Sequence, residues 1–258
     1  QELLPPGLVI QAEIPNCQFP GRSYEAEDQR FPGESIKRVI SFFDHSNADD
    51  WKPKWKQDFS ERLRILTSTP MRHVVRPLEA THVDGFDYVI TDQRDATIKS
   101  LMHVSGNQTD KSELFKQLLE GIKELHRLDI VHGAICSDHV QHSRHKNNEV
   151  QCQLISAEWG LMHFWSKDCG QEINNELKKY YPPEWVKGPE GTREGDVYAA
   201  GIIACELFAD TAKIGDYKKD TKVLRKELKL FKTPTADANL ICNILDRKIQ
   251  IAATALDS

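Results

Sequence analysis

Residues 124–140, ELHRLDIVHGAICSDHV, are the stretch that decides the fold. They begin inside a helix predicted over 111–128, because apolar residues recur there at helical spacing. That apolar stripe consists of Leu114, Phe115, Leu118, Leu119, Ile122 and Leu125. Two short strands are predicted after the stretch, VQHS at 140–143 and VQCQLIS at 150–156, separated by a polar turn. The stretch is therefore predicted to be a loop between a long amphipathic helix and a hairpin.

The residues before this helix predict a small antiparallel sheet. Three strands are expected in GLVIQAEI, RSYEAED and SIKRVISFF, with Pro-Gly turns at 20–21 and 32–33. A helix is expected within 49–68, where Phe59, Leu63 and Leu66 have helical spacing, and a hairpin within 73–92.

The residues after position 190 predict more helices. The segment EGDVYAAGIIACELFAD is nearly all apolar, which indicates a buried central helix, and KVLRKELKLF and ANLICNILDRKIQIAATAL continue the helical pattern. The expected fold class is α+β, since strands and helices are segregated along the chain. We expect a small antiparallel-sheet lobe with one main helix over 1–92 and a larger helical lobe over 93–258.

Composition excludes several functions. The 258 residues carry a net charge of -5, with 39% hydrophobic and 28% charged residues, as in soluble globular proteins. Without a basic excess the chain is not expected to bind nucleic acid, and the basic run LKLFK at 228–232 is interpreted as a solvated helix face. Six cysteines without a CxxC pair favour reduced thiols in a cytoplasmic protein. The longest apolar run, 199–209, is too short to span a bilayer.

The order of five motifs resembles the protein kinase family, in its bacterial Ser/Thr type. The motifs are FPGRSYEAEDQRFPGESIKRVI, ELHRLDIVHGAICSDHV, QLISAEWGL, YYPPEW and GDVYAAGIIACELF. They are similar to the glycine loop with the third strand, the catalytic loop, the metal-binding motif, the A-P-E segment and the helix that anchors the catalytic loop. The resemblance implies a bilobal kinase-like fold over essentially the whole chain. It also implies, as an alternative to a purely cytoplasmic protein, the cytoplasmic domain of a longer membrane-tethered one.

The same resemblance implies that the catalytic loop has lost its chemistry. His132 matches the family histidine, but Ala134 stands where the family has the aspartate that accepts the substrate proton. A positioned base is worth about a hundred- to ten-thousand-fold in rate, and a methyl group cannot replace it. His139 stands at the asparagine that would hold a second magnesium ion, for which imidazole is a poor ligand.

The resemblance also implies an altered nucleotide site. Glu158 replaces the metal-binding aspartate, while Gly160 of that motif is kept. The phosphate loop retains only Gly21, so fewer backbone amides can approach the phosphates, and Ser23 replaces the valine that roofs the adenine. ATP binding is expected to be weak or absent, with no cofactor and no metal.

The phosphate-binding lysine has two registers. Lys37 is favoured, because Ile36 then points inward, but a shift of one residue gives Arg38. Its expected ion-pair partner is Glu61, whereas the family's strict spacing gives Arg62, which would repel it.

Residues that hold the family's shape are kept. Asp196 matches the aspartate that hydrogen-bonds the backbone of the catalytic loop, and Gly201 allows close packing of the central helix. Glu184 matches the A-P-E glutamate, with Arg247 as its expected partner, while His132 and Gly160 are expected to be structural.

The sequence therefore predicts a pseudokinase, which is not an enzyme and acts as a protein-binding scaffold or allosteric regulator in signalling. The expected partners are proteins, such as an active kinase or a phosphopeptide-binding domain. The alternative is a divergent enzyme that transfers phosphoryl or nucleotidyl groups slowly from ATP, with Glu158 as metal ligand.

Overall fold

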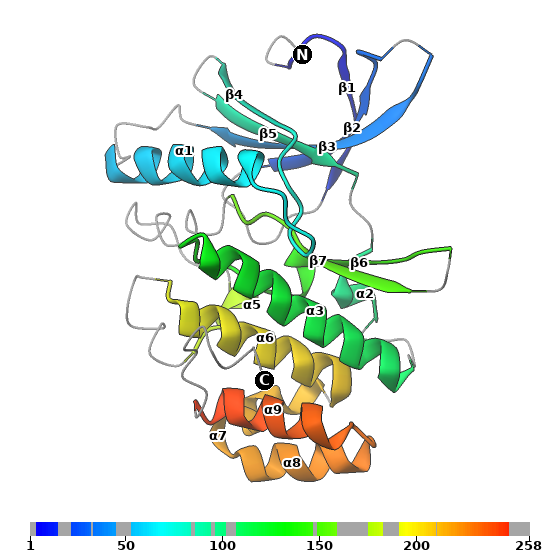
Figure 1. Cartoon of the computed structure of the whole chain (residues 1–258), viewed down its shortest axis with the longest axis vertical. Helices are drawn as coiled ribbons and strands as arrows, with labels where there is room; N and C mark the ends of the chain where they lie inside the picture. The colour runs from blue at the N-terminus through cyan, green and yellow to red at the C-terminus, as the bar shows by residue number, and fades with distance from the viewer. Residues whose placement is uncertain are drawn as a thin grey trace.

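The structure is a computed structural model with two lobes, a sheet lobe and a helical lobe (Figure 1). It describes residues 4–14, 22–31, 33–44, 53–83, 86–93, 96–101, 107–146, 149–158, 175–182, 191–209 and 211–247. The predicted α+β class with a bilobal arrangement is confirmed.

The small lobe is built on a five-stranded antiparallel sheet. Its strand order is β1-β2-β3-β5-β4, as expected for a meander followed by a hairpin. The strands are β1 (Leu8–Ile14), β2 (Arg22–Asp28), β3 (Ile36–Asp44), β4 (Glu79–Val83) and β5 (Phe86–Asp92). One sheet face packs Ala26, Ile40 and Ile90 into a hydrophobic cluster. The other face carries Ser23, paired with Ser41 across β2 and β3.

The main helix of this lobe, α1 (Pro53–Ser68), lies between the sheet and the helical lobe (Figure 1). Its buried face consists of Phe59, Arg62 and Leu66, at spacings of three and four residues. After α1 the chain is tied to the helical lobe, because Leu154 N donates to His73 O at 2.8 Å and Val75 N to Leu154 O at 2.8 Å.

The helical lobe is organised around α6 (Arg193–Phe208), in which residues 195–208 are all buried. The expectation of a buried central helix is confirmed. Thr192 caps α6 by accepting from Gly195 N at 3.1 Å. A Cβ on Gly201 would lie 2.6 Å from the side chain of Ile244, so the glycine permits close approach of α9 (Thr235–Leu245).

The other described elements of this lobe surround α6 or follow it in the chain. They are α2 (Ile98–Leu101), α3 (Gln108–Arg127), the 3₁₀ helix η2 (Ser137–His139), β6 (Val140–Arg144), β7 (Val150–Leu154), α5 (Asn175–Lys178), η4 (Thr211–Lys213), α7 (Ile214–Lys219) and α8 (Thr221–Leu230). The predicted hairpin after the catalytic-loop stretch is the pair β6–β7. Within the part of the chain that is described, no helix combines the length and the apolar character that crossing a bilayer requires.

Candidate functional site

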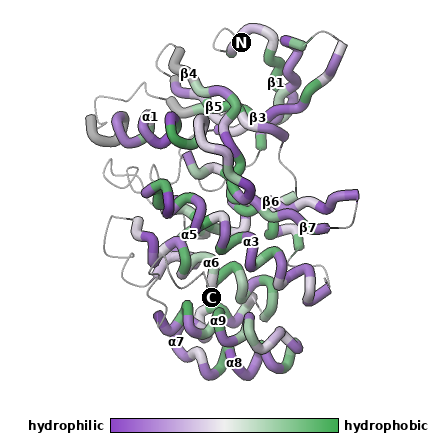
Figure 2. Tube along the Cα trace, in the orientation of Figure 1, coloured by the Kyte–Doolittle hydropathy of each residue, from purple (hydrophilic) through white to green (hydrophobic). Residues whose placement is uncertain are grey.

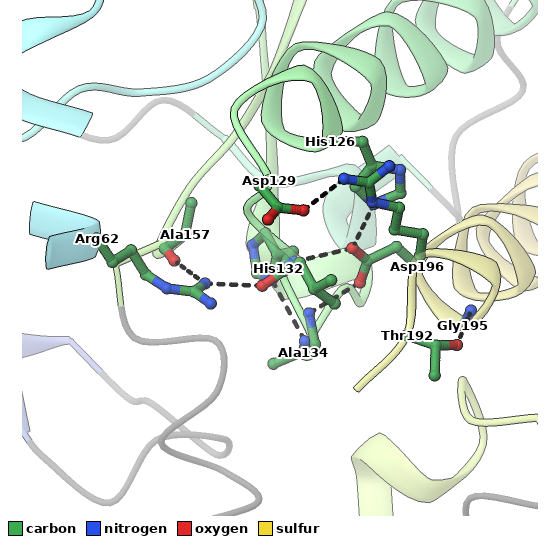
Figure 3. Close-up of polar contacts among 12 residues, drawn as sticks. Arg62, His126, Asp129, His132, Ala134, Ala157, Thr192, Gly195 and Asp196 are labelled. Carbon is green, nitrogen blue, oxygen red and sulfur yellow. Dashed lines mark hydrogen bonds and ion pairs between the residues drawn. The ribbon is translucent and has the colours of Figure 1, made fainter. Parts of the chain in front are cut away.

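The site lies where α1, the loop 128–136 and the N-terminal end of α6 meet (Figure 3). Its centre is Asp196, which is 1% exposed and is held in the first turn of α6. Asp196 Oδ2 accepts from His132 N at 2.8 Å and Oδ1 accepts from Gly133 N at 2.8 Å. One buried carboxylate thus fixes two successive backbone amides, as a charge-assisted hydrogen-bond pair does.

His126, at the end of α3, is the third partner of this carboxylate. Its Nε2 lies 2.9 Å from Asp196 Oδ2, and its side chain is only 8% exposed. His126 was not expected from the sequence, because its position directly after Leu125, at the end of the buried face of α3, indicates packing only. The structure therefore ties α3, the loop and α6 together at one residue.

The His132 ring is buried and serves the loop rather than a substrate. Its Nε2 donates to Ile155 O at 3.0 Å, and its Nδ1 accepts from Ala134 N at 3.3 Å, which defines a neutral tautomer. Burial lowers the pKa of His132, and nearby Asp196 opposes this effect. The histidine is thus neutral at physiological pH and positions the backbone of residues 132–134.

Ala134 and His139 hold each other through the backbone. Ala134 is 3% exposed, and its carbonyl accepts from His139 Nδ1 at 2.6 Å. His139 is itself 5% exposed in η2, so this ring nitrogen is used inside the loop. The arrangement gives the loop a fixed shape, and position 134 offers only a methyl group.

Arg62 supplies the buried positive charge of the site. Its Nη1 donates to Val131 O at 2.7 Å and to Ala157 O at 2.9 Å (Figure 3). Burial lowers the pKa of Arg62 to about 10, while the charges of Asp196, Asp58 and Glu158 oppose the shift. The guanidinium therefore stays charged at neutral pH and joins α1 to both sides of the loop region.

The expected ion pair between Lys37 and Glu61 is not formed, and a role of these residues in binding a nucleotide stays a prediction. Lys37 is exposed at the start of β3, opposite Glu27. Glu61 is exposed on α1, where it forms an ion pair with Arg64 at 2.7 Å. The helix turns Arg62 inward instead, because its position three residues after Phe59 and four before Leu66 lies on the buried face.

The alternative register, with Arg38, does not supply the missing charge either. Arg38 forms an ion pair with Asp92, and its Nε lies 3.7 Å from Asp28 Oδ2. Ser23 of β2 lies opposite Ser41 of β3, and their Oγ atoms are 2.9 Å apart in a buried hydrogen bond. This face of the sheet thus carries hydroxyl groups at these two positions. The buried cation of this site thus comes from the helix and not from the strand.

Glu158 is 3% exposed and directly follows Ala157, whose carbonyl is bound by Arg62. A carboxylate is a suitable ligand for a hard divalent cation, but one carboxylate is a small donor set for a metal site. Of the other expected site residues, Gly21, Gly160 and Glu184 lie outside the described residues. Arg247 is described, and its guanidinium lies 5.8 Å from the centre of the Tyr198 ring.

Chemically, the arrangement binds backbone rather than a reacting group. Asp196, His132 and Arg62 direct their polar atoms at amides and carbonyls of residues 131–134 and 155–157. Nothing at position 134 can accept a proton from a substrate. The sequence could have indicated that Arg62 faces inward, because it lies three residues after Phe59 and four before Leu66, on the apolar side of α1.

Comparison with known proteins identifies the family. A family model described as protein kinase domain matches residues 36–251. Among curated relatives, cyclin-dependent kinase 12 of Caenorhabditis elegans is 33% identical over 48% of this chain and 16% of its own length. Calcium-dependent protein kinase 22 of Arabidopsis thaliana is 24% identical over 74% of this chain and 34% of its own. The chain thus spans about a third or less of these two relatives.

Bacterial proteins are similar as well. A probable serine/threonine-protein kinase, pknA2 of Bifidobacterium longum, is 23% identical over 72% of this chain and 24% of its own length. The kinase domain of PknI from Mycobacterium tuberculosis superposes with a TM-score of 0.61 at 14% identity, covering 94% of this chain and 96% of that one. Rad53 in complex with AMP-PNP superposes with a TM-score of 0.64 at 14% identity, over 93% and 60% of the two chains. These structures share the fold. Since the relatives include worm, plant and bacterial kinases, the bacterial type stays a prediction.

The expectation that this chain is not an enzyme is wrong as a conclusion from sequence. The protein kinase domain match, the relatives named as protein kinases and the structural matches all point to an enzyme. The expectation rested on Ala134, His139, Glu158 and the single glycine of the phosphate loop, and these substitutions do not outweigh the match over the whole domain.

Proposed function

The chain belongs to the protein kinase domain family, and from this premise we propose that it is a signalling domain which binds a protein partner and controls it allosterically. Its cytoplasmic location and its protein partner, an active kinase or a phosphopeptide-binding domain, are parts of this proposal. The observation that carries it is the buried Arg62, which joins α1 to Val131 O and Ala157 O.

This contact supports a conformation that does not depend on a nucleotide. The Arg62 guanidinium and the Asp196 carboxylate together hold the loop from α1 and from α6. A domain held in one shape presents a constant surface to a partner, and a partner that prefers this shape stabilises it in return. The loop geometry is built from backbone contacts, so it forms without substrate.

The test compares partner binding by Arg62→Met with that by Arg64→Met. Arg64 lies on the same helix, is exposed, and pairs only with exposed Glu61 among the contacts described for it. Tagged chains are expressed in the host, and associated kinases are quantified by mass spectrometry. We expect Arg62→Met to lose the associated kinase while Arg64→Met keeps it; equal recovery by both variants would contradict the proposal.

A second candidate function is slow transfer of a phosphoryl or nucleotidyl group from ATP. It is favoured by Glu158, a buried carboxylate beside the Arg62 contact. A bound divalent ion would supply charge neutralisation at the phosphates, and Glu158 is the residue that would hold it. Arg62 adds a fixed positive charge near Glu158, whose negative charge raises the pKa of Arg62.

Thermal shift with ATP and Mn²⁺ tests this second function. Ligand at a hundredfold above its dissociation constant adds about 2.7 kcal/mol of stability. Under this hypothesis ATP with Mn²⁺ raises the melting temperature of the wild-type chain, and Glu158→Gln loses this rise. The wild type also transfers a phosphoryl or nucleotidyl group from ATP to itself or to a peptide. The absence of any shift at millimolar ATP would remove this candidate.

A further inference from the structure

The outward face of α8 combines exposed apolar and basic side chains. Val223, Leu230 and Phe231 are 37%, 73% and 43% exposed. They are three of the seven exposed large hydrophobic residues in the part of the chain that the structure describes, and they lie within nine residues of sequence. Single exposed apolar residues are common on protein surfaces, but a cluster of them beside basic residues indicates a surface that binds a membrane or another molecule.

The helix geometry explains why these residues face outward. Leu224 and Leu228 are fully buried one turn apart, so they define the inner face of α8. Lys226 lies opposite that face, with Lys222 and Lys229 on one side of it and Val223 and Leu230 on the other, at 3.6 residues per turn. The outer face is therefore half basic and half apolar. Figure 2 shows hydrophilic and hydrophobic residues alternating along α8.

The charge of this segment is opposite to that of the chain. Residues 218–232 contain seven basic and two acidic residues, while the whole chain carries -5. Both acids are engaged within the fold: Asp220 accepts from Lys222 N at 2.8 Å, and Glu227 pairs with Lys213 at 2.8 Å. The positive charge of α8 therefore faces solvent.

The end of α8 holds its apolar tip in place. Lys232 N donates to Lys229 O at 3.1 Å and Thr233 N to Leu228 O at 2.9 Å, which is a Schellman motif. Gln108 Nε2 also donates to Phe231 O at 3.1 Å. Lys232 has φ of +56°, a conformation for which glycine is the favoured residue. A basic side chain thus stands next to the apolar tip at a backbone position that disfavours it.

We propose that this face, formed by Lys222, Val223, Lys226, Lys229, Leu230, Phe231 and Lys232, docks on an anionic lipid bilayer surface. The ammonium groups contact phosphate and carboxylate headgroups, and the apolar side chains enter the headgroup boundary. α8 lies at the end of the molecule farthest from the sheet, so a flat surface can approach it (Figure 1). An acidic peptide is a less suitable occupant, because these apolar side chains project from one helix instead of lining a groove between elements.

The test is sedimentation of the 258-residue chain with phosphatidylcholine vesicles, with and without phosphatidylserine. We expect binding only to the phosphatidylserine vesicles, and weaker binding as salt shortens the Debye length to about 3 Å at 1 M. Each neutralised lysine lowers the partition coefficient by about fivefold. The triple variant Lys222→Gln, Lys226→Gln, Lys229→Gln is therefore expected to lose about a hundredfold.

A second variant tests the apolar part of the surface. Leu230→Ser with Phe231→Ser is expected to lose about tenfold in partitioning. The matched control is Val9→Ser with Ile10→Ser on β1, whose residues are 40% and 39% exposed, and which should bind as the wild type does. Circular dichroism and melting temperature check that each variant is folded.

Lys232→Gly separates a role in binding from one in stability. The glycine relieves the strain at φ of +56°, so the melting temperature is expected to rise while vesicle binding falls about fivefold. The proposal is overturned if phosphatidylserine vesicles do not bind the wild type at low salt, or if pure phosphatidylcholine binds it equally. It is also overturned if the lysine variant loses binding while the Leu230 and Phe231 variant keeps it, since the surface would then attract any polyanion, such as an acidic peptide.

Discussion

Replacing Arg62 by methionine tests the contact on which the site depends. Methionine keeps much of the length of the side chain and its helix propensity, and removes the guanidinium. The change leaves Val131 O and Ala157 O without the hydrogen bonds of 2.7 and 2.9 Å that Arg62 donates. The loop would then be held from the side of Asp196 alone.

The magnitude follows from two opposing effects. Two hydrogen bonds from a charged donor contribute about 3–6 kcal/mol together. Burial lowers the pKa of Arg62 from 12.5 to about 10, which corresponds to about 3 kcal/mol of cost for keeping the charge there. The difference, with the unpaired carbonyls added, predicts that Arg62→Met lowers the free energy of unfolding by about 2 kcal/mol. For a chain of this size that is about 5 °C in melting temperature.

The assay is urea unfolding followed by tryptophan fluorescence, with Arg64→Met as the control. Arg64 and Glu61 are exposed neighbours on α1, so their ion pair is expected to contribute little. Hydrogen exchange at the amides of His132 and Gly133 gives the local readout, since these amides bind Asp196. If Arg62→Met and Arg64→Met unfold at the same urea concentration and exchange alike, the argument that Arg62 holds the loop is refuted.

Two further predictions concern pH and packing. Because burial lowers the pKa of His132 from 6.5, its contribution to stability is fully present above pH 6.5 and is lost as pH falls below it, by up to about 1.4 kcal/mol per pH unit. Urea unfolding between pH 5 and 8 should therefore show that the free energy of unfolding depends less steeply on pH for His132→Gln than for the wild type. Equal pH dependence of the two proteins would contradict the assigned neutral state. Gly121→Ala would place a Cβ 2.7 Å from His73 O and is expected to lower the free energy of unfolding by about 1–3 kcal/mol. Gly215→Ala, whose Cβ would have no neighbour within 4 Å, should raise it by up to about 1 kcal/mol through helix propensity. Thermal unfolding measures both variants, and a stabilised Gly121→Ala would disprove the close approach.

Much of the fold could be predicted because local patterns agree with the tertiary structure. The strands expected in RSYEAED and SIKRVISFF match β2 and β3, and the stripe from Leu114 to Leu125 matches α3. The apolar segment 194–210 matches α6, because a helix that is hydrophobic all round has to be buried. These features depend on neighbours in sequence, which the sequence shows directly.

The expected ion pair between Lys37 and Glu61 was wrong, because such a pair depends on contacts between distant segments. Sequence spacing did not decide whether Lys37 or Arg38 is the phosphate-binding residue. In the structure neither of them takes part in the buried contact that Arg62 makes. The helix spacing of Phe59 and Leu66 could have indicated that Arg62 faces inward. Glu61 was favoured as the partner because Arg62, which the family's strict spacing gives, would repel Lys37.

The sequence by itself determined the two lobes, the central helix and the residues of the loop, including the methyl group at Ala134. Those follow from periodicity and residue identity, which are local properties. Only the tertiary structure decided that α1 presents Arg62 rather than Glu61 to the loop, and that the Asp196 carboxylate, which was expected to bind the loop backbone, also binds His126. The orientation of a helix and the partner of a buried charge depend on desolvation and packing between segments 60 to 95 residues apart, as for Arg62 with Ala157 and Asp196 with His132.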